Sequence, residues 1–234
     1  MPLEIRTVAR TASTNADMIL LAADGVGEGV WLRAEEQSAG RGRLGRDWVS
    51  PRGNLYASTL VRPRSHDPVP ATLSLVAAVA LEETLRGWGA DAVIKWPNDL
   101  VLAGAKLSGV LLERSGGAVI VGIGVNLASH PEGLDRPVTS FAAAGLGAPD
   151  PALFIADLAE AFQRWVAIWR GGLAPVRSRW LERAHPLGTP LAVRLPGAAP
   201  VEGLFDGLSA DGALHLRLPS GDVQAIHAGD VFMI

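Results

Sequence analysis

The stretch from Ala92 to Asn126, AVIKWPNDLVLAGAKLSGVLLERSGGAVIVGIGVN, predicts a series of short β-strands joined by tight turns. Its apolar runs cover residues 92–96, 100–103, 107–114 and 118–126. Ser115-Gly116-Gly117 separates the last two runs and is typical of a β-hairpin connection. This stretch therefore predicts at least part of a β-sheet.

Helices and further strands are predicted on both sides of it. Strands are expected over 3–8, 30–35 and 54–61, and helices over 70–88, 151–170 and 175–184. A further helix is expected to begin at Ser13 or Thr14 and to end near Gly25. After Pro186, short apolar runs alternate with turn residues, as in a small β-barrel. The residues alone thus predict an α+β domain over 1–185 and a β-barrel domain over 186–234.

The composition of the 234-residue chain excludes several classes of function. A formal net charge of −3 argues against a protein held on DNA mainly by phosphate contacts. The absence of cysteine excludes disulfides, thiolate metal sites and cysteine nucleophiles. No secretory leader and no run long enough to span a bilayer is found, so we expect a cytoplasmic protein without a membrane partner.

Some polar residues are rare in this arginine-rich chain. The only lysines are Lys95 and Lys106, and the only tyrosine is Tyr56. The only asparagines are Asn15, Asn54, Asn98 and Asn126. Where such a chain keeps a rare polar residue, its specific chemistry is a candidate reason. The alternative is that the asparagines occupy turns.

The segment Gly40-Arg41-Gly42-Arg43-Leu44-Gly45-Arg46 matches the pattern G-x-G-x-x-G. A dinucleotide-binding interpretation requires a helix directly after it, but Pro51 and Gly53 follow and lead into a strand. We therefore favour a flexible loop whose guanidinium groups bind a carboxylate or phosphate. A solvated basic turn is the alternative.

The two lysines lie within one short window. Lys95-Trp96-Pro97-Asn98-Asp99 forms a tight connection, at which asparagine and aspartate can bind a ligand or simply form a turn. Lys106 begins a strand beside the small residues Ser108 and Gly109, so its ammonium can reach a pocket. An exposed lysine without a function is the alternative.

Taken together, these segments closely resemble the biotin protein ligases. The resemblance is carried by Ser13-Thr14-Asn15, Gln37, Gly40 to Arg46, Trp48, Ser50-Pro51, Gly53 to Tyr56, Lys95 to Leu100, Lys106 to Glu113 and Gly122 to Asn126. It implies a mixed β-sheet flanked by helices, related to the class II aminoacyl-tRNA synthetases, followed by a small SH3-like β-barrel. It also implies a ligase without repressor function, because no winged-helix DNA-binding domain precedes Ser13. Ala105 stands where many relatives have glycine or a basic residue.

The activity implied by the resemblance is a two-step acyl transfer. Biotin would react with Mg²⁺-bound ATP to give biotinyl-5′-AMP, and a lysine of a biotin carboxyl carrier protein would then accept the biotin. Lys106, Arg43 and Asp99 are the expected catalytic residues. The expected biotin-binding residues are Ser13, Thr14, Asn15, Gln37, Gly40, Arg41, Gly42, Arg43 and Lys106. The expected nucleotide-binding residues are Arg46, Trp48, Lys95, Asn98, Asp99 and Asn126. No metal ion held by the protein itself and no nucleic-acid partner are expected.

Two other functions remain open at this point. A ligase for lipoate or octanoate would have a similar fold, although the Gly/Arg loop and Lys95-Trp96-Pro97-Asn98 favour biotin. A biotin sensor or scaffold would use the C-terminal barrel for interaction and would consume no ATP. Many members of the family are dimers, and we expect edge strands near Lys106 to Asn126 that would allow a homodimer.

Overall fold

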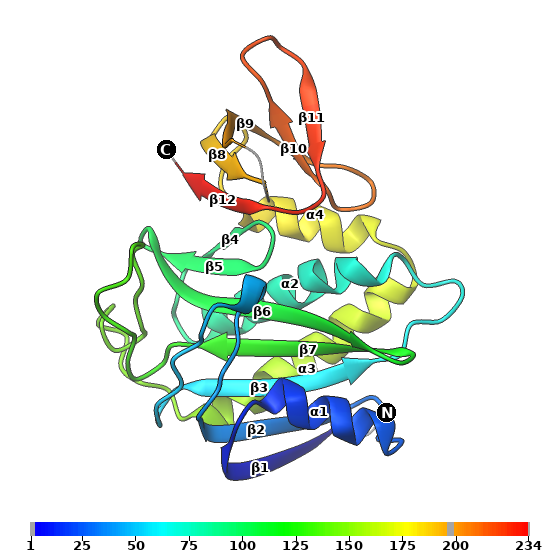
Figure 1. The fold of residues 1–234 in the computed structure, drawn as a ribbon, viewed down its shortest axis with the longest axis vertical. Helices are drawn as coiled ribbons and strands as arrows, with labels where there is room; N and C mark the ends of the chain where they lie inside the picture. The colour runs from blue at the N-terminus through cyan, green and yellow to red at the C-terminus, as the bar shows by residue number, and fades with distance from the viewer. Residues whose placement is uncertain (1–2, 196–198, 234) are drawn as a thin grey trace.

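The computed structural model describes residues 3–195 and 199–233. Its larger sheet has seven strands in the order β1-β2-β3-β7-β6-β5-β4 (Figure 1). The strands are β1 (Glu4–Thr11), β2 (Val30–Gln37), β3 (Leu55–Val61), β4 (Val93–Lys95), β5 (Asp99–Leu102), β6 (Ala105–Ser115) and β7 (Ala118–Val125). Only β1 and β2 pair in parallel, so the sheet is mixed.

Helices cover both faces of this sheet (Figure 1). They are α1 (Thr14–Ala23), α2 (Leu73–Gly87), α3 (Pro151–Arg170) and α4 (Ala174–Arg183). Helix α1 packs on one face through a small apolar cluster that includes Met18, Leu60 and Ile120. Helices α2, α3 and α4 pack into the main core with the other face. The expected mixed sheet flanked by helices is confirmed.

The alternation of side chains along β7 explains why one face stays open. Val119, Val121, Ile123 and Val125 belong to the main core under α2 and α3. Successive side chains of a strand point to opposite faces, so Gly122 and Gly124 fall on the same face as Ile120 and α1. That face therefore lacks side chains at both of these positions, next to the start of α1.

Two of the expected elements differ from the structure. The helix expected from Pro70 begins at Leu73, after a 3₁₀ turn over Pro70–Thr72. The expectation of edge strands near Lys106 to Asn126 is wrong, because β6 and β7 lie inside the sheet and its outer strands are β1 and β4. Strand order is a non-local property, which explains why the strand pattern alone did not reveal it.

The chain continues from α4 into a second sheet of five antiparallel strands. Its order is β11-β10-β9-β8-β12, and its strands are β8 (Pro190–Arg194), β9 (Val201–Leu208), β10 (Leu214–Arg217), β11 (Val223–Ile226) and β12 (Asp230–Met233). This arrangement is consistent with the expected SH3-like barrel. The division expected after residue 185 falls in the connection between α4 and β8, and it stays a prediction.

A buried carboxylate fixes the helix that precedes the second sheet. Glu82 of α2 is fully buried and accepts hydrogen bonds from Arg179 at 3.1 Å and Arg183 at 2.7 Å, both on α4. A buried charge is tolerated only when it is paired in this way. The contact therefore ties α4, and with it the start of the second sheet, to the main core. Within 3–195 and 199–233, no helix combines the length and apolar character needed to cross a membrane.

Candidate active site

A cavity of about 350 Å³ lies where the open face of the large sheet meets the second sheet. Its wall is formed by the start of α1, the loop after β2, the β4–β5 turn, strands β6 and β7, and strand β12. All of the residues expected to bind biotin or nucleotide line it, except Gly40 and Asn126. The other residues that were selected from the sequence therefore lie around one cavity.

Three glycines leave room for the larger side chains of the cavity. A Cβ on Gly122 would collide with the side-chain amide of Asn15, and one on Gly124 would lie 2.6 Å from the Trp48 ring. Gly109, the cross-strand partner of Gly124, has Lys106 Nζ only 3.2 Å from where a Cβ would be. The glycines of β6 and β7 thus allow close approach, as expected for glycine inside a strand.

Polar groups at the start of α1 form a hydrogen-bonded cluster. The Thr14 backbone N–H donates to Gln37 Oε1 at 2.8 Å. The Ser58 hydroxyl lies 2.7 Å from Thr14 Oγ1 and 2.6 Å from Asn15 Oδ1. Ser13 precedes the helix, and its hydroxyl makes no capping hydrogen bond. This end of the cavity can recognise a compact polar group through several oriented donors and acceptors.

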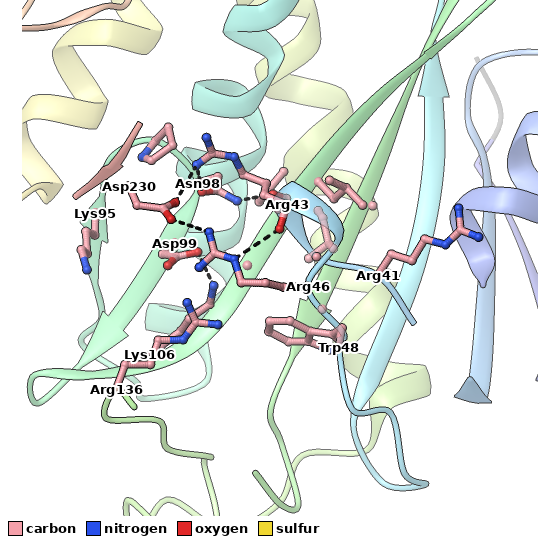
Figure 2. A pocket seen from close by; sticks show the side chains of 18 of the residues that line it. Arg41, Arg43, Arg46, Trp48, Lys95, Asn98, Asp99, Lys106, Arg136 and Asp230 are labelled. Atoms are coloured by element: carbon pink, nitrogen blue, oxygen red, sulfur yellow. Dashed lines mark hydrogen bonds and ion pairs between the residues drawn. The ribbon is translucent and has the colours of Figure 1, made fainter. Parts of the chain in front are cut away.

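Charged side chains gather at the other end (Figure 2). Lys106 Nζ donates to Asp99 Oδ1 at 2.5 Å, and both side chains are largely buried. Burial lowers the pKa of Lys106, while the neighbouring carboxylate of Asp99 opposes that shift. The ammonium also lies 5.4 Å from the centre of the Trp48 ring. Lys106 therefore presents a compact cation next to the glycine-lined strands.

The Gly/Arg loop is anchored to the second sheet. Arg43 donates to Asn98 Oδ1 at 3.1 Å and to the Gly229 carbonyl at 3.4 Å. Arg46 donates to Asp230 Oδ2 at 2.6 Å (Figure 2). The C-terminal residues Gly229 and Asp230 therefore hold the loop across the cavity.

Two members of the Gly/Arg loop lie apart from this cluster. Arg41 lines the cavity, but its guanidinium points away from the other charged groups in Figure 2. Gly40 lies outside the lining, and a Cβ there would be 2.5 Å from Ser50 Oγ. Glycine at position 40 therefore lets the loop return close to its own start.

Lys95 is the other lysine of the cavity. It lies 5.7 Å from the centre of the Phe232 ring of β12, and burial lowers its pKa. Asn98 presents its Oδ1 to Arg43 while its Nδ2 donates to the Val110 carbonyl. Both residues thus occupy the positions that the sequence predicted, at the turn between β4 and β5.

Asn126, which was expected to contact the nucleotide, does not line the cavity. Its side-chain amide donates to the Thr139 carbonyl at 3.0 Å, and its backbone N–H donates to the Leu107 carbonyl. Asn54 has a similar role, since its Oδ1 accepts hydrogen bonds from three successive backbone N–H groups, at 127–129. These asparagines fasten the chain after β7, and the nucleotide contact expected for Asn126 stays a prediction.

Several cavity residues were not expected from the sequence. Arg136 belongs to the loop after β7, and Asp230 and Phe232 belong to the second sheet. The motif-based reasoning placed the whole site in the first 126 residues, so it could not find them. Among the described residues, no group of three or more histidine, aspartate or glutamate side chains is placed to hold a metal ion.

Comparison with known proteins identifies the family. Residues 14–128 match the model of the biotin/lipoate A/B protein ligase family, and residues 187–233 match that of the biotin protein ligase C-terminal domain. A biotin–[acetyl-CoA-carboxylase] ligase of Paracoccus denitrificans is 45% identical over 240 residues, covering 96% of this chain and 98% of the relative. The chain belongs to the biotin protein ligase family. A second such ligase, of Mycobacterium tuberculosis, is 34% identical over 97% of this chain and 88% of the relative.

Solved structures of biotin protein ligases share the fold over nearly the whole chain. The Aquifex aeolicus enzyme in complex with biotin and ATP superposes with a TM-score of 0.88 at 24% identity, covering 99% of each chain. The Leishmania major enzyme in complex with biotinyl-5-AMP has a TM-score of 0.67 at 26% identity, covering 97% of this chain and all of the other. The expected architecture, including the C-terminal sheet, is that of the family.

Proposed function

We propose that this chain catalyses ATP-dependent formation of biotinyl-5′-AMP and then transfers biotin to a lysine of a biotin carboxyl carrier protein. One observation carries the proposal: a single cavity joins a hydrogen-bonding end at α1 to a cationic end at Lys106. The hydrogen-bonding end suits a polar ring system, and the cationic end suits a carboxylate that reacts with a phosphate. The names of its relatives point to the carrier of acetyl-CoA carboxylase as the acceptor.

The hydrogen-bonding end is proposed to bind the ureido ring of biotin. Ser13, Thr14, Asn15 and Gln37 supply hydroxyl and amide groups, and Ser58 holds two of them in place. A site built to hydrogen-bond a buried polar ring strongly disfavours an analogue that lacks its polar atoms. This end therefore favours biotin over lipoate, which has no ureido group. The match of residues 187–233 to the biotin protein ligase C-terminal domain supports the same choice.

The cationic end is proposed to carry the first reaction. A carboxylate oxygen of biotin forms a bond to the α-phosphorus of ATP, and the bond to the β-phosphate oxygen breaks to release pyrophosphate. Lys106 would stabilise the charge that develops on the α-phosphate, since its ammonium lies deep in the cavity. Arg43 would cover the ligand from the Gly/Arg loop and shelter the mixed anhydride from water.

The second reaction needs a neutral lysine amine on the carrier. The amine nitrogen attacks the acyl carbon of biotinyl-5′-AMP, the carbon–oxygen bond to phosphate breaks, and AMP leaves. A free lysine has a pKa of about 10.4, so it must first lose a proton at neutral pH. We propose that Asp99 orients this amine or takes its proton through Oδ2, because its Oδ1 is engaged by Lys106.

Further aspects of the proposal concern the partners of the enzyme. Mg²⁺ would enter as part of the nucleotide substrate, because Mg²⁺ in such sites is bound largely by substrate phosphates and water. The nucleotide would be closed in by Arg46, Trp48, Lys95 and Asn98, which line the same cavity. A cytoplasmic location without nucleic-acid or membrane partners is also proposed. A homodimer stays a prediction.

Mass spectrometry of an acceptor tests the proposal directly. The protein is incubated with biotin, Mg²⁺, ATP and an apo carrier domain, and the carrier is expected to gain the mass of one biotinyl group. Parallel reactions with lipoate and with octanoate are expected to leave the carrier unchanged. Binding of biotin without ATP-dependent pyrophosphate release would instead indicate a sensor or scaffold and would refute the enzymatic function.

A further inference from the structure

Arg136 is carried into the cavity by a loop that is hydrogen-bonded to the Lys106 backbone. The Lys106 N–H donates to the Pro137 carbonyl, and the Thr139 N–H donates to the Lys106 carbonyl, both at 2.9 Å. These two bonds fix the backbone on the C-terminal side of Arg136. Figure 2 shows the guanidinium reaching toward Lys106, and Arg136 lines the cavity.

The guanidinium of Arg136 has no partner in residues 3–195 and 199–233. Its Nε is buried without a hydrogen bond, and no carboxylate lies within 4.0 Å of its nitrogens. Two neighbouring cations are different, since Lys106 pairs with Asp99 and Arg46 pairs with Asp230. Leaving a partly buried charge unpaired is costly, so such a group indicates a place for an anion.

The charges around Arg136 also favour an anion at this place. Burial is the main cause that lowers the pKa of Lys95 and of Lys106, and the like charge of the Arg136 guanidinium lowers both further. Asp99 opposes these shifts at both lysines, and Asp230 opposes the shift at Lys95. Lys95, Lys106, Arg46 and Arg136 thus outnumber these two carboxylates, and a polyanion would relieve the repulsion.

We propose that Arg136 binds the β- and γ-phosphates of ATP and stabilises them as they leave as pyrophosphate. This inference rests on the proposed function and assigns a residue to its leaving group. Lys106, whose side chain is 14% exposed, would serve the α-phosphate next to the biotin carboxylate. Arg136 approaches Lys106 from a largely exposed loop, and the remaining phosphates would extend toward it. Its planar fork can bind two phosphate oxygens at once.

The chemistry restricts this role to one half of the reaction. When the α-phosphorus–oxygen bond breaks, its electron pair stays on the departing pyrophosphate, so negative charge accumulates there. Arg136 would neutralise that charge in the forward step and bind pyrophosphate in the reverse step. The transfer of biotin from the adenylate to the carrier involves no pyrophosphate, and Arg136 should not influence it.

The test compares Arg136→Gln and Arg136→Lys with wild type in the two half-reactions. Loss of a charge-assisted hydrogen bond costs about 1.5–3 kcal/mol, which corresponds to roughly 10–100-fold in affinity. In Arg136→Gln, the KM for pyrophosphate in ATP synthesis from biotinyl-5′-AMP should rise by that factor. Arg136→Lys should recover part of the loss. Transfer from pre-formed biotinyl-5′-AMP to the carrier should proceed at the wild-type rate.

Arg217→Gln serves as the matched control, since Arg217 pairs with Asp206 on the second sheet and does not line the cavity. Calorimetric titration with inorganic pyrophosphate adds a measurement that needs no turnover. Equal pyrophosphate affinity in wild type and Arg136→Gln would overturn the assignment, as would an equal loss in both half-reactions. Failure of the proposed function has a different signature, in which the wild-type enzyme itself forms no biotinyl-5′-AMP.

Discussion

Replacement of His185 by leucine should remove a loss of stability in mild acid. His185 follows α4, is only 5% exposed, and packs against Phe205 of β9 with ring centres 4.4 Å apart. Neither of its ring nitrogens has a hydrogen-bond partner among the residues that the structure describes. Burial, assisted by the positive charge of Lys95, lowers its pKa to about 4.

The sign and size of the effect follow from this pKa. An unperturbed histidine has a pKa of about 6.5, so between pH 6.5 and 4 the unfolded chain binds a proton that the folded protein rejects. Stability therefore falls as the pH falls through this window, and the loss levels off below about pH 4. At about 1.4 kcal/mol per pH unit, the loss between pH 7 and 5 is about 2 kcal/mol.

Urea unfolding at pH 7 and pH 5 measures this difference. The free energy of unfolding of wild type should fall by about 2 kcal/mol more than that of His185→Leu, because carboxylates contribute to both proteins alike. His66→Leu provides a control at an exposed histidine, and it should follow wild type. Parallel pH dependence of wild type and His185→Leu would refute the reasoning.

Three further substitutions test the active site. Lys106→Ala should retain biotin binding, measured by calorimetry, far better than adenylation, which should fall roughly 10²–10³-fold in a pyrophosphate-release assay; near-normal turnover would remove Lys106 from the mechanism. Arg43→Gly should let activated biotin escape and label lysines of a bystander protein, which mass spectrometry detects; labelling confined to the carrier would contradict a sheltering role. Gly124→Ala should raise the KM for substrates at an unchanged melting temperature, because its Cβ would displace Trp48; an unchanged KM would show that the ring position is unimportant.

Local patterns predicted much of the fold. The start of α3 is one example. Asp150 precedes the helix and accepts a hydrogen bond from the Ala152 N–H at 2.8 Å, and Pro151 is the first residue of the helix. The hairpin between β6 and β7 is another, with Ser115 paired to Ala118. These features depend on residues close in sequence. The order of strands in the sheet depends on distant pairings, and the expected edge strands proved to be interior.

The candidate site was predictable only in part, for a related reason. Scarcity singled out Lys95, Lys106 and Asn98, and all three line the cavity. Asn126 is equally rare, but it lies outside the lining and its amide donates to the Thr139 carbonyl, so scarcity alone does not predict which rare residues reach the cavity. Asp230 belongs to none of the motifs found in the sequence. Its position beside Arg46 arises because the second sheet folds back onto the first.

The pairing of the Gly/Arg loop with Asp230 also bears on substrate exchange. Arg46 already holds this carboxylate at 2.6 Å, and Arg43 lies 3.9 Å from it. In the proposed mechanism, a phosphate that reaches these arginines would compete with an anion that the chain itself keeps in place. The same carboxylate would replace the phosphate when a product leaves. We therefore expect Asp230 to act as an internal counter-ion, which would lower the affinity for the nucleotide and speed the release of AMP.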